Sequence, residues 1–116
     1  MKNQLPRNYV RTERRRWALT QREVAYLLGF ESRTSVSRIE LGKCVPDLES
    51  ALALEVLFGV APRMMFPHIF GETEERVMRH AKVLYEAALK STKPRERRKQ
   101  ALFELAVKRA TAHVRV

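Results

Sequence analysis

The sequence predicts an all-α protein, with five short helices in a first domain, residues 1–70, and two longer helices in an extension, residues 71–116. Three observations support this fold class. Apolar residues recur at helical spacing along most of the chain, and no segment shows the strict alternation of a strand. Glycine and proline fall between these segments, where they end helices. Several helix starts carry a side chain that can cap them.

The first helix is expected from about Asn8 to Trp17, because the Asn8 side chain can cap its first turn. Val10, Arg14 and Trp17 then share one face. We expect this face to point inward and Trp17 to lie in the core. This face contains one charged residue, Arg14.

The second helix has the clearest start in the chain. Thr20 and Glu23 are spaced as a capping box, in which each side chain accepts a hydrogen bond from the backbone N–H of the other residue. Gly29 can adopt the left-handed conformation that ends a helix. The residues expected to face inward are Val24, Ala25, Leu27 and Leu28.

The third helix is expected over about Ser32 to Leu41, with the Ser32 hydroxyl as its cap. Its strong apolar residues are Val36 and Ile39, spaced i and i+3. A stripe this narrow buries one side of the helix and leaves the other sides free to bind a ligand.

The fourth and fifth helices follow Gly42 and a short loop. Asp47 can cap the fourth, Gly59 can end it, and Pro62 suits the first turn of a short fifth helix through about Phe66. Leu48, Leu52 and Val56 repeat every four residues and are expected to face the core. The apolar residues that widen this stripe are Ala53, Leu54, Leu57 and Phe58.

Beyond Gly71 the pattern changes to two longer helices, from about Glu72 to Lys90 and from about Arg95 onward. The connection between them, Ser91-Thr92-Lys93-Pro94, is typical of a tight turn. We therefore expect an antiparallel hairpin that docks a second seam on the first domain or on another chain. The apolar positions with heptad-like spacing are Val77, Ala81, Leu84 and Ala88, then Phe103, Val107, Ala110 and Val114.

The charge of the chain indicates a polyanionic partner. Lys and Arg number 23 against 13 Asp and Glu, a net charge of +10, and nucleic acid is the commonest polyanion. Cys44 is the only cysteine, which excludes an intrachain disulfide and favours a cytoplasmic setting. We expect no membrane span and no export signal, because the apolar runs are short. No catalytic or metal-ligand spacing is apparent, so we expect neither an enzyme nor a cofactor.

Half of the chain carries motifs of one known family. They are Leu19-Thr20-Gln21, Val24-Ala25, Leu28-Gly29, Val36-Ser37-Arg38-Ile39-Glu40, Gly42-Lys43, Pro46, and Leu57 to Val60. With them, residues 9 to about 66 resemble the Cro/lambda-repressor-like helix-turn-helix domain of the XRE family. The resemblance implies a five-helix DNA-binding domain that docks its third helix in the major groove, usually as a dimer. It also implies a partly buried salt bridge between Arg14 and Glu40, two independent surface charges being the alternative.

The candidate DNA contacts combine position and side-chain chemistry. Residues of the third helix that lie off the Val36 and Ile39 stripe can bond base edges or phosphates, the alternative being a solvated polar face. The turn before this helix is one residue longer than is usual in the family, which leaves open which of its first residues reaches a base. Gln21 is a DNA contact by resemblance, and basic residues nearby are phosphate partners by charge. The candidates are Gln21, Arg22, Arg33, Thr34, Ser35, Ser37, Arg38 and Lys43. Lys2 and Arg7 form a candidate basic arm, with a disordered tail as the alternative.

We predict a sequence-specific transcriptional regulator that binds double-stranded DNA. A repressor is favoured, acting as a homodimer on a palindromic operator whose half-sites lie roughly 34 Å apart. Two alternatives stay open. In the first, the C-terminal helices bind a partner protein, as in an antitoxin that also represses its own operon. In the second, the chain is a basic structural protein associated with RNA, although the usual RNA-binding platforms are missing.

Overall fold

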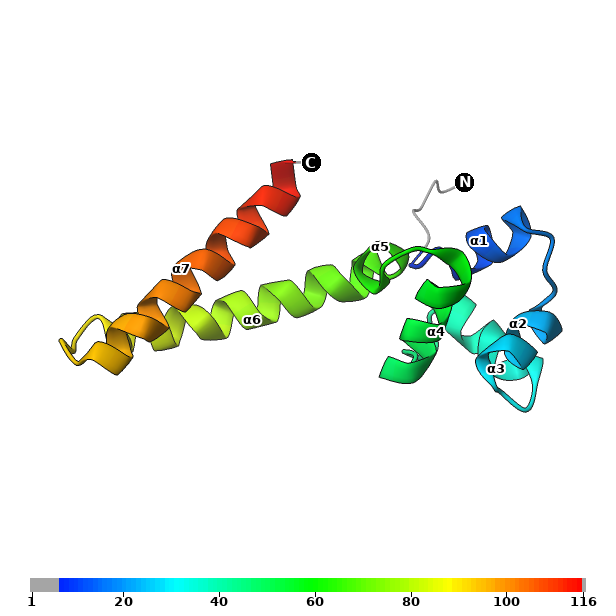
Figure 1. The fold of residues 1–116 in the computed structure, drawn as a ribbon, viewed down its shortest axis with the longest axis horizontal. Coiled ribbons are helices and arrows are strands. Elements are labelled where there is room, and N and C mark those ends of the chain that lie inside the picture. Colours follow the sequence, from blue (N-terminus) through cyan, green and yellow to red (C-terminus); the bar gives the residue numbers. More distant parts are fainter. Residues whose placement is uncertain (1–6, 116) are drawn as a thin grey trace. The chain divides into compact units, whose positions relative to one another are not determined.

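The computed structural model describes residues 7–115, with the side chains of residues 113–115 left out. All regular structure in this range is helical, which confirms the predicted all-α class (Figure 1). The seven helices are α1 (Val10–Arg16), α2 (Gln21–Leu28), α3 (Arg33–Glu40), α4 (Leu48–Phe58), α5 (Pro62–Met65), α6 (Pro67–Ala88) and α7 (Pro94–Arg115). The chain divides into two compact units, an N-terminal unit that ends at Phe70 and a C-terminal unit that begins at Gly71. Within residues 7–115, no helix combines the length and the apolar character needed to cross a membrane.

Three helices of the N-terminal unit, α2, α3 and α4, begin at a side chain that caps them. At α2 the Glu23 N–H donates to Thr20 Oγ1 over 3.0 Å and the Thr20 N–H donates to Glu23 Oε1 over 2.8 Å, so the predicted capping box is confirmed. Gly29 ends the helix with φ +80°. At α4 the Ser50 N–H donates to Asp47 Oδ1 over 2.8 Å, and this bond lowers the pKa of the Asp47 carboxyl.

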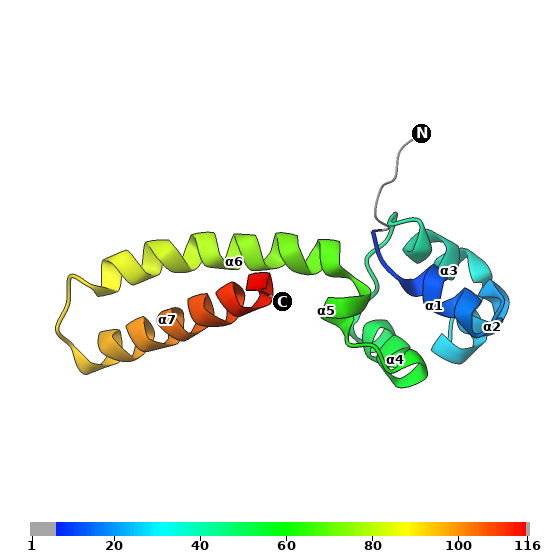
Figure 2. The same cartoon turned by 90° about the horizontal axis from the view of Figure 1, so that it is seen from above.

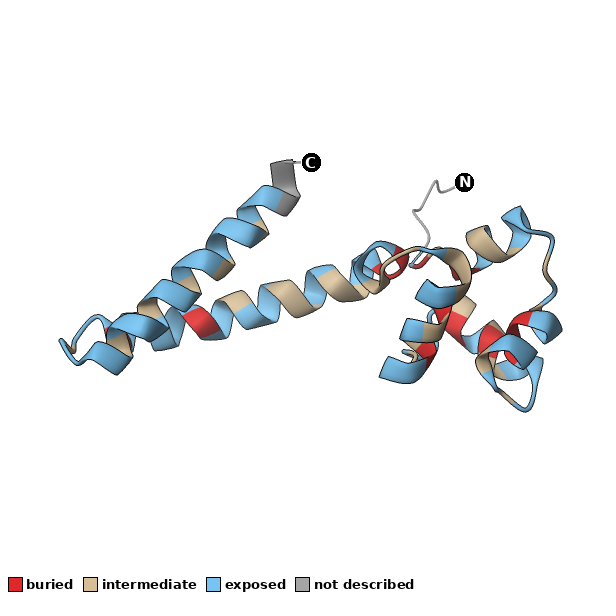
Figure 3. Ribbon diagram, in the orientation of Figure 1, coloured by how far each residue is buried: buried red, intermediate tan, exposed pale blue. Residues whose placement is uncertain are grey.

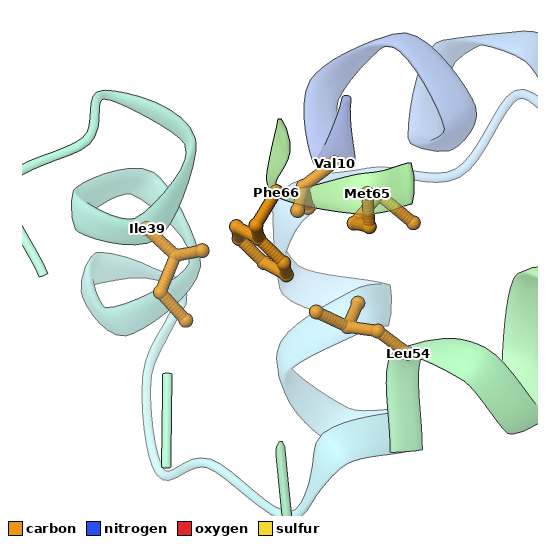
Figure 4. Close-up of a cluster of buried hydrophobic side chains, with 5 residues drawn as sticks. All are labelled: Val10, Ile39, Leu54, Met65 and Phe66. Carbon is orange, nitrogen blue, oxygen red and sulfur yellow. The ribbon is translucent and has the colours of Figure 1, made fainter. Parts of the chain in front are cut away.

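The core of the N-terminal unit consists of two adjoining clusters of buried side chains. Figure 4 shows the first, formed by Val10, Ile39, Leu54, Met65 and Phe66. The second is formed by Val24, Ala25 and Val36, and the half-buried Leu28, Phe30 and Phe58 pack against both clusters. Burying a large aliphatic side chain contributes about 1.5–3 kcal/mol. Helices this short are marginal alone, so packing holds them in place.

The chain entering α1 is fixed by a buried asparagine. Asn8 Nδ2 donates to the Ile39 carbonyl over 2.9 Å, and its Oδ1 accepts from the Val10 N–H over 3.1 Å. The Tyr9 N–H donates to the Met65 carbonyl over 2.9 Å. The N-cap of α1 is therefore Tyr9 and not Asn8 as expected, but Asn8 still bonds the first N–H of the helix and ties this start to α3.

Trp17 does not lie in the core, so that prediction is wrong. The side chain is 60% exposed, because α1 ends at Arg16 and the next residue, Ala18, takes a left-handed φ of +58°. This turn brings Leu19 onto the second cluster instead. The Arg16 guanidinium lies over the Trp17 ring, 5.5 Å from its centroid, which is a cation–π contact.

The buried face of α4 is also not the predicted one. Ser50 and Leu54 are buried, whereas Leu48, Leu52 and Val56 are exposed, Val56 to 87% (Figure 3). The helix is apolar on almost every side, so its spacing could not identify the inner face. On α2, Leu27 is likewise exposed rather than inward.

In the C-terminal unit, α6 and α7 run in opposite directions, as predicted (Figure 2). The predicted break at Gly71 is wrong, because α6 starts at Pro67 and continues through this glycine. Pro67 suits a first helical turn, and one glycine inside a helix costs only about 1 kcal/mol relative to alanine.

Few side chains are buried between α6 and α7. Among the described residues of the C-terminal unit, only Ala81 and Ala88 are buried, and of the other heptad-spaced residues Val77, Leu84 and Val107 are about half exposed. Phe103 and Ala110 are half-buried, and the side chain of Val114 lies outside the described part. Polar bonds join the helices instead. Tyr85 Oη donates to Glu104 Oε2 over 2.9 Å, which raises the pKa of Tyr85, and Gln100 Nε2 donates to the Ala88 carbonyl over 2.9 Å.

Candidate nucleic-acid interface

The helix α3 presents a polar and basic side to solvent. The Thr34 N–H donates to Ser32 Oγ over 3.3 Å, so the helix starts at the predicted cap. Val36 and Ile39 are buried against α1, α2 and α4, and this confirms the predicted stripe. The other sides of the helix carry residues that can donate hydrogen bonds. Arg33, Thr34 and Arg38 are exposed, and Ser35 and Ser37 are half-buried.

The last residue of α3 is held by two other helices. Arg14 Nε donates to Glu40 Oε2 over 2.6 Å and Arg14 Nη2 donates to Glu40 Oε1 over 3.2 Å. A bidentate pair of this kind fixes geometry as well as charge. Gln21 Nε2 donates to Glu40 Oε1 over 3.1 Å, and Arg14 Nη1 donates to the Leu19 carbonyl over 3.0 Å. The structure thus brings Arg14, Gln21 and Glu40 together in one network.

Beside this network lies a hollow of about 720 Å³ between α1, the start of α2 and α3. Of the eight predicted contact residues, Gln21, Arg22, Arg33 and Ser37 line it. Two further arginines line it from α1, Arg11 and Arg15, and neither was predicted from the sequence. Their spacing of i and i+4, on the side of Arg14, is the sequence signal that could have identified them.

The remaining candidates lie at the two ends of α3. Thr34 lines a second hollow with Arg22 and Arg33, next to the turn that precedes α3. Lys43 follows the other end, where its N–H donates to the Arg38 carbonyl over 2.8 Å. Arg7 lies here too, so close that a Cβ added at Gly42 would be 2.5 Å from Arg7 Cδ. Lys2, the other candidate of the basic arm, lies outside the described residues.

The chemical groups at this interface determine whether it suits a metal ion or another ligand. Within the described part of the chain, no three side chains from His, Cys, Asp and Glu gather closely enough to hold a metal ion. Cys44, which follows Lys43, is a free and exposed thiol. The groups on offer at the interface are therefore hydrogen-bond donors and positive charges, which suit a phosphate-bearing ligand.

Comparison with known proteins identifies a family for the N-terminal half of the chain. A family model described as a helix-turn-helix domain matches residues 8–65, which is half of the chain. The match begins at the buried asparagine before α1 and ends at the last residue of α5. No curated protein and no solved structure matches the chain.

Proposed function

The chain belongs to the helix-turn-helix domain family, and from that premise we propose that it is a sequence-specific regulator that binds double-stranded DNA through α3. The observation that carries the proposal is the arrangement around Glu40. Two helices fix the end of α3, one stripe of α3 is buried, and its donor-rich sides are free. A helix held in this way fits the width of the major groove.

We propose a role for each candidate contact from its position. Arg33 and Thr34, in the first turn of α3, are placed to approach base edges, as is Ser35 or Ser37 according to the register of the helix on the duplex. Arg38 can bond a base or a phosphate. Arg22 and Lys43 carry exposed charges that suit phosphate.

Gln21 combines a structural and a binding role in this proposal. One N–H of its side-chain amide donates to Glu40. An amide nitrogen carries two N–H groups, so the second stays available for a DNA phosphate. Gln21 would then link the backbone of the duplex to the end of α3.

Arg33 and Lys43 provide the test of DNA reading. Duplexes would first be selected from a random pool with the whole protein, and binding would then be titrated on the selected duplex and on a mismatched one. Arg33→Ala should lower discrimination at one base pair by about 1–3 kcal/mol. Lys43→Ala should weaken binding to both duplexes alike and flatten the dependence on salt. Equal losses on both duplexes for Arg33→Ala would remove its base-reading role, and selection of no common sequence would refute specific binding.

The C-terminal unit is proposed as a dimerisation element. Its described part exposes seven large aliphatic side chains to about half of their area or more: Val77, Val83, Leu84, Leu89, Leu102, Leu105 and Val107. A standard interface buries about 800 Å² on each partner, and homodimer interfaces are the more apolar ones. Two hairpins packed together would cover these side chains as a four-helix bundle does. A palindromic operator and repression by occupancy follow as parts of the same proposal.

Sedimentation can test the dimer with a matched pair of variants. Leu84→Glu places a charge on the exposed side of α6, whereas Val56→Glu places the same charge on exposed α4. We expect the first to shift the protein toward monomer and the second to leave the wild-type state unchanged. A monomeric wild type, or a dimer lost only with Val56→Glu, would refute this role for the hairpin.

The same exposed hairpin favours one alternative, a regulator whose C-terminal unit binds a different protein. This alternative keeps the DNA-binding unit and changes only the occupant of the hairpin. Purification of the native chain at an equimolar ratio with a second protein, lost with Leu84→Glu, would support it over the homodimer.

A further inference from the structure

The hollow between α1, α2 and α3 is unusually rich in positive charge. Five arginines line it against a single carboxylate, that of Glu40. Arg14 already neutralises Glu40 through two hydrogen bonds. Four arginines therefore remain as net positive charge around a space of about 720 Å³. Arg22 and Arg33 are already candidate DNA contacts, but Arg11 and Arg15 on α1 have no role yet.

Arg11 and Arg15 lie on one side of α1. They are four residues apart, a spacing that places side chains one above the other on a helix. Both are exposed, and neither has a carboxylate partner at ion-pair distance among the described residues. Arg16 is also exposed, but it pairs with Glu13 at 3.7 Å, lies over Trp17 and does not line the hollow.

The start of α2 also lines the hollow. Thr20, Gln21 and Arg22 line it. The Glu23 N–H of this turn is already capped by Thr20, whereas the backbone N–H groups of Gln21 and Arg22 have no acceptor inside the helix and lie at the positive end of the helix dipole. The α1 arginines and this turn thus line one space together, which is an arrangement that favours an anion.

We propose that this hollow seats backbone phosphates of the duplex that α3 reads, and that Arg11 and Arg15 are DNA-backbone contacts. The inference rests on the proposed function, because α3 lines the same hollow through Arg33 and Ser37. A duplex whose major groove receives α3 brings a phosphate strand along the edge of that groove. The α1 arginines hold this strand, so α1 orients the protein on DNA without reading sequence.

The salt dependence of binding measures such contacts. Each neutralised phosphate contributes about 0.9 to the slope of log affinity against log salt concentration. Loss of two contacts should therefore flatten the slope by about 1.8. Between about 50 and 200 mM salt, the affinity advantage of the wild type over the double variant should then shrink about tenfold. The effect should be the same on matched and mismatched duplexes, since phosphates carry no base identity.

The experiment compares the full-length wild type with Arg11→Gln, Arg15→Gln, their double variant and Arg16→Gln. Arg16→Gln removes the same charge from the same helix but outside the hollow, so it measures the general effect of charge. Each protein is titrated on the selected duplex and a mismatched one over the salt series, after thermal melting shows that it is folded. We expect slopes flattened by about 0.9 for each single variant and no comparable change for Arg16→Gln.

The outcomes separate this inference from the proposed function. A wild type that binds no duplex with sequence preference would refute the proposed function. A wild type that binds specifically, while the double variant keeps its slope, would overturn the phosphate seat alone. Equal flattening by Arg16→Gln would also overturn it, because the charge of α1 would then act without the hollow. A loss confined to the matched duplex would instead assign base reading to α1.

Discussion

The two units of this chain are both helical, but they differ in helix length and in how many side chains they bury. The five helices that form the N-terminal unit with the start of α6 are 4 to 11 residues long, yet they enclose two clusters of buried side chains. The helices α6 and α7 are 22 residues each, yet Ala81 and Ala88 are the only buried side chains in the described part of the C-terminal unit. Helix length and core formation are therefore inversely related in this molecule.

The difference follows from where helical stability comes from. A helix shorter than about 12 residues is marginal in water, so the N-terminal helices persist because they pack on one another. The C-terminal helices are long enough to gain more from their own hydrogen bonds, and they can leave apolar side chains uncovered. One unit is thus built as a fixed scaffold and the other as a surface, and four experiments test this description.

The largest loss of stability is expected at the ion pair between Arg14 and Glu40. Glu40→Ala should lower the free energy of unfolding by about 3–5 kcal/mol, because it leaves the Arg14 charge uncompensated in a site where these side chains are only 12% and 3% exposed. Urea unfolding measures the loss. Glu13→Ala is the control, since its partner Arg16 lies at the surface and the pair is worth at most about 1 kcal/mol. Similar losses of unfolding free energy for both variants would show that the pair of Arg14 and Glu40 is no stronger than a surface ion pair.

Because the two units differ in packing, truncation of a leucine should lower the unfolding free energy much more in the N-terminal unit than in the C-terminal unit. Leu54→Ala removes a side chain that is 1% exposed and should cost about 2–5 kcal/mol. Leu84→Ala, at 58% exposed, should change the unfolding free energy by no more than about 0.5 kcal/mol at concentrations where the chain is monomeric. Denaturant unfolding of both variants checks this. A large loss for Leu84→Ala in dilute protein would mean that the C-terminal unit has a core of its own.

Substitution of alanine by glycine should stabilise the protein at one position of the N-terminal unit and destabilise it at one position of the C-terminal unit. Ala18→Gly should stabilise the protein by about 0.5–1 kcal/mol, because a left-handed φ of +58° is strained for alanine and not for glycine. Ala101→Gly, at an exposed position inside α7, should destabilise by about 1 kcal/mol. Thermal melting of both variants gives the signs. Destabilisation by Ala18→Gly would show that the turn after α1 is held without strain.

The smallest effect concerns the cap of α4 and depends on pH. The hydrogen bond from the Ser50 N–H holds the pKa of Asp47 below its ordinary value, so the charged cap stabilises the fold above about pH 4 and this contribution is lost as pH falls through the lowered pKa. Asp47→Asn keeps a side-chain oxygen that cannot titrate. The melting temperature of the wild type should exceed that of the variant near neutral pH, and the gap should close below about pH 4. A constant gap would exclude the titration of Asp47 as its cause.

The sequence was sufficient where structure is decided locally. The capping box of Thr20 and Glu23, the cap at Asp47 and the narrow stripe of Val36 and Ile39 each depend on residues within a turn or two. They were predicted correctly because their physical cause lies inside the same short segment.

The predictions of burial were wrong at positions where packing between helices, and not the local sequence, determines which side chains are buried. The stripe of Leu48, Leu52 and Val56 is as apolar as the buried side of α4, so only the packing of neighbouring helices selects between them. Trp17 was misplaced because the chain turns at Ala18, an alanine in a conformation that favours glycine. The spacing of Arg11 and Arg15 places them on one side of α1, but their position at a shared hollow depends on how α1 packs against α2 and α3.

The network at Glu40 has a further consequence, for the entropy of association. Side chains of α1 and α2 fix the end of α3 during folding, so the ordering of this helix is complete before any partner arrives. Flexible binding segments lose that freedom when they bind, at a cost to affinity. A ligand of α3 meets a preorganised helix, and only the exposed side chains on its surface have freedom left to lose.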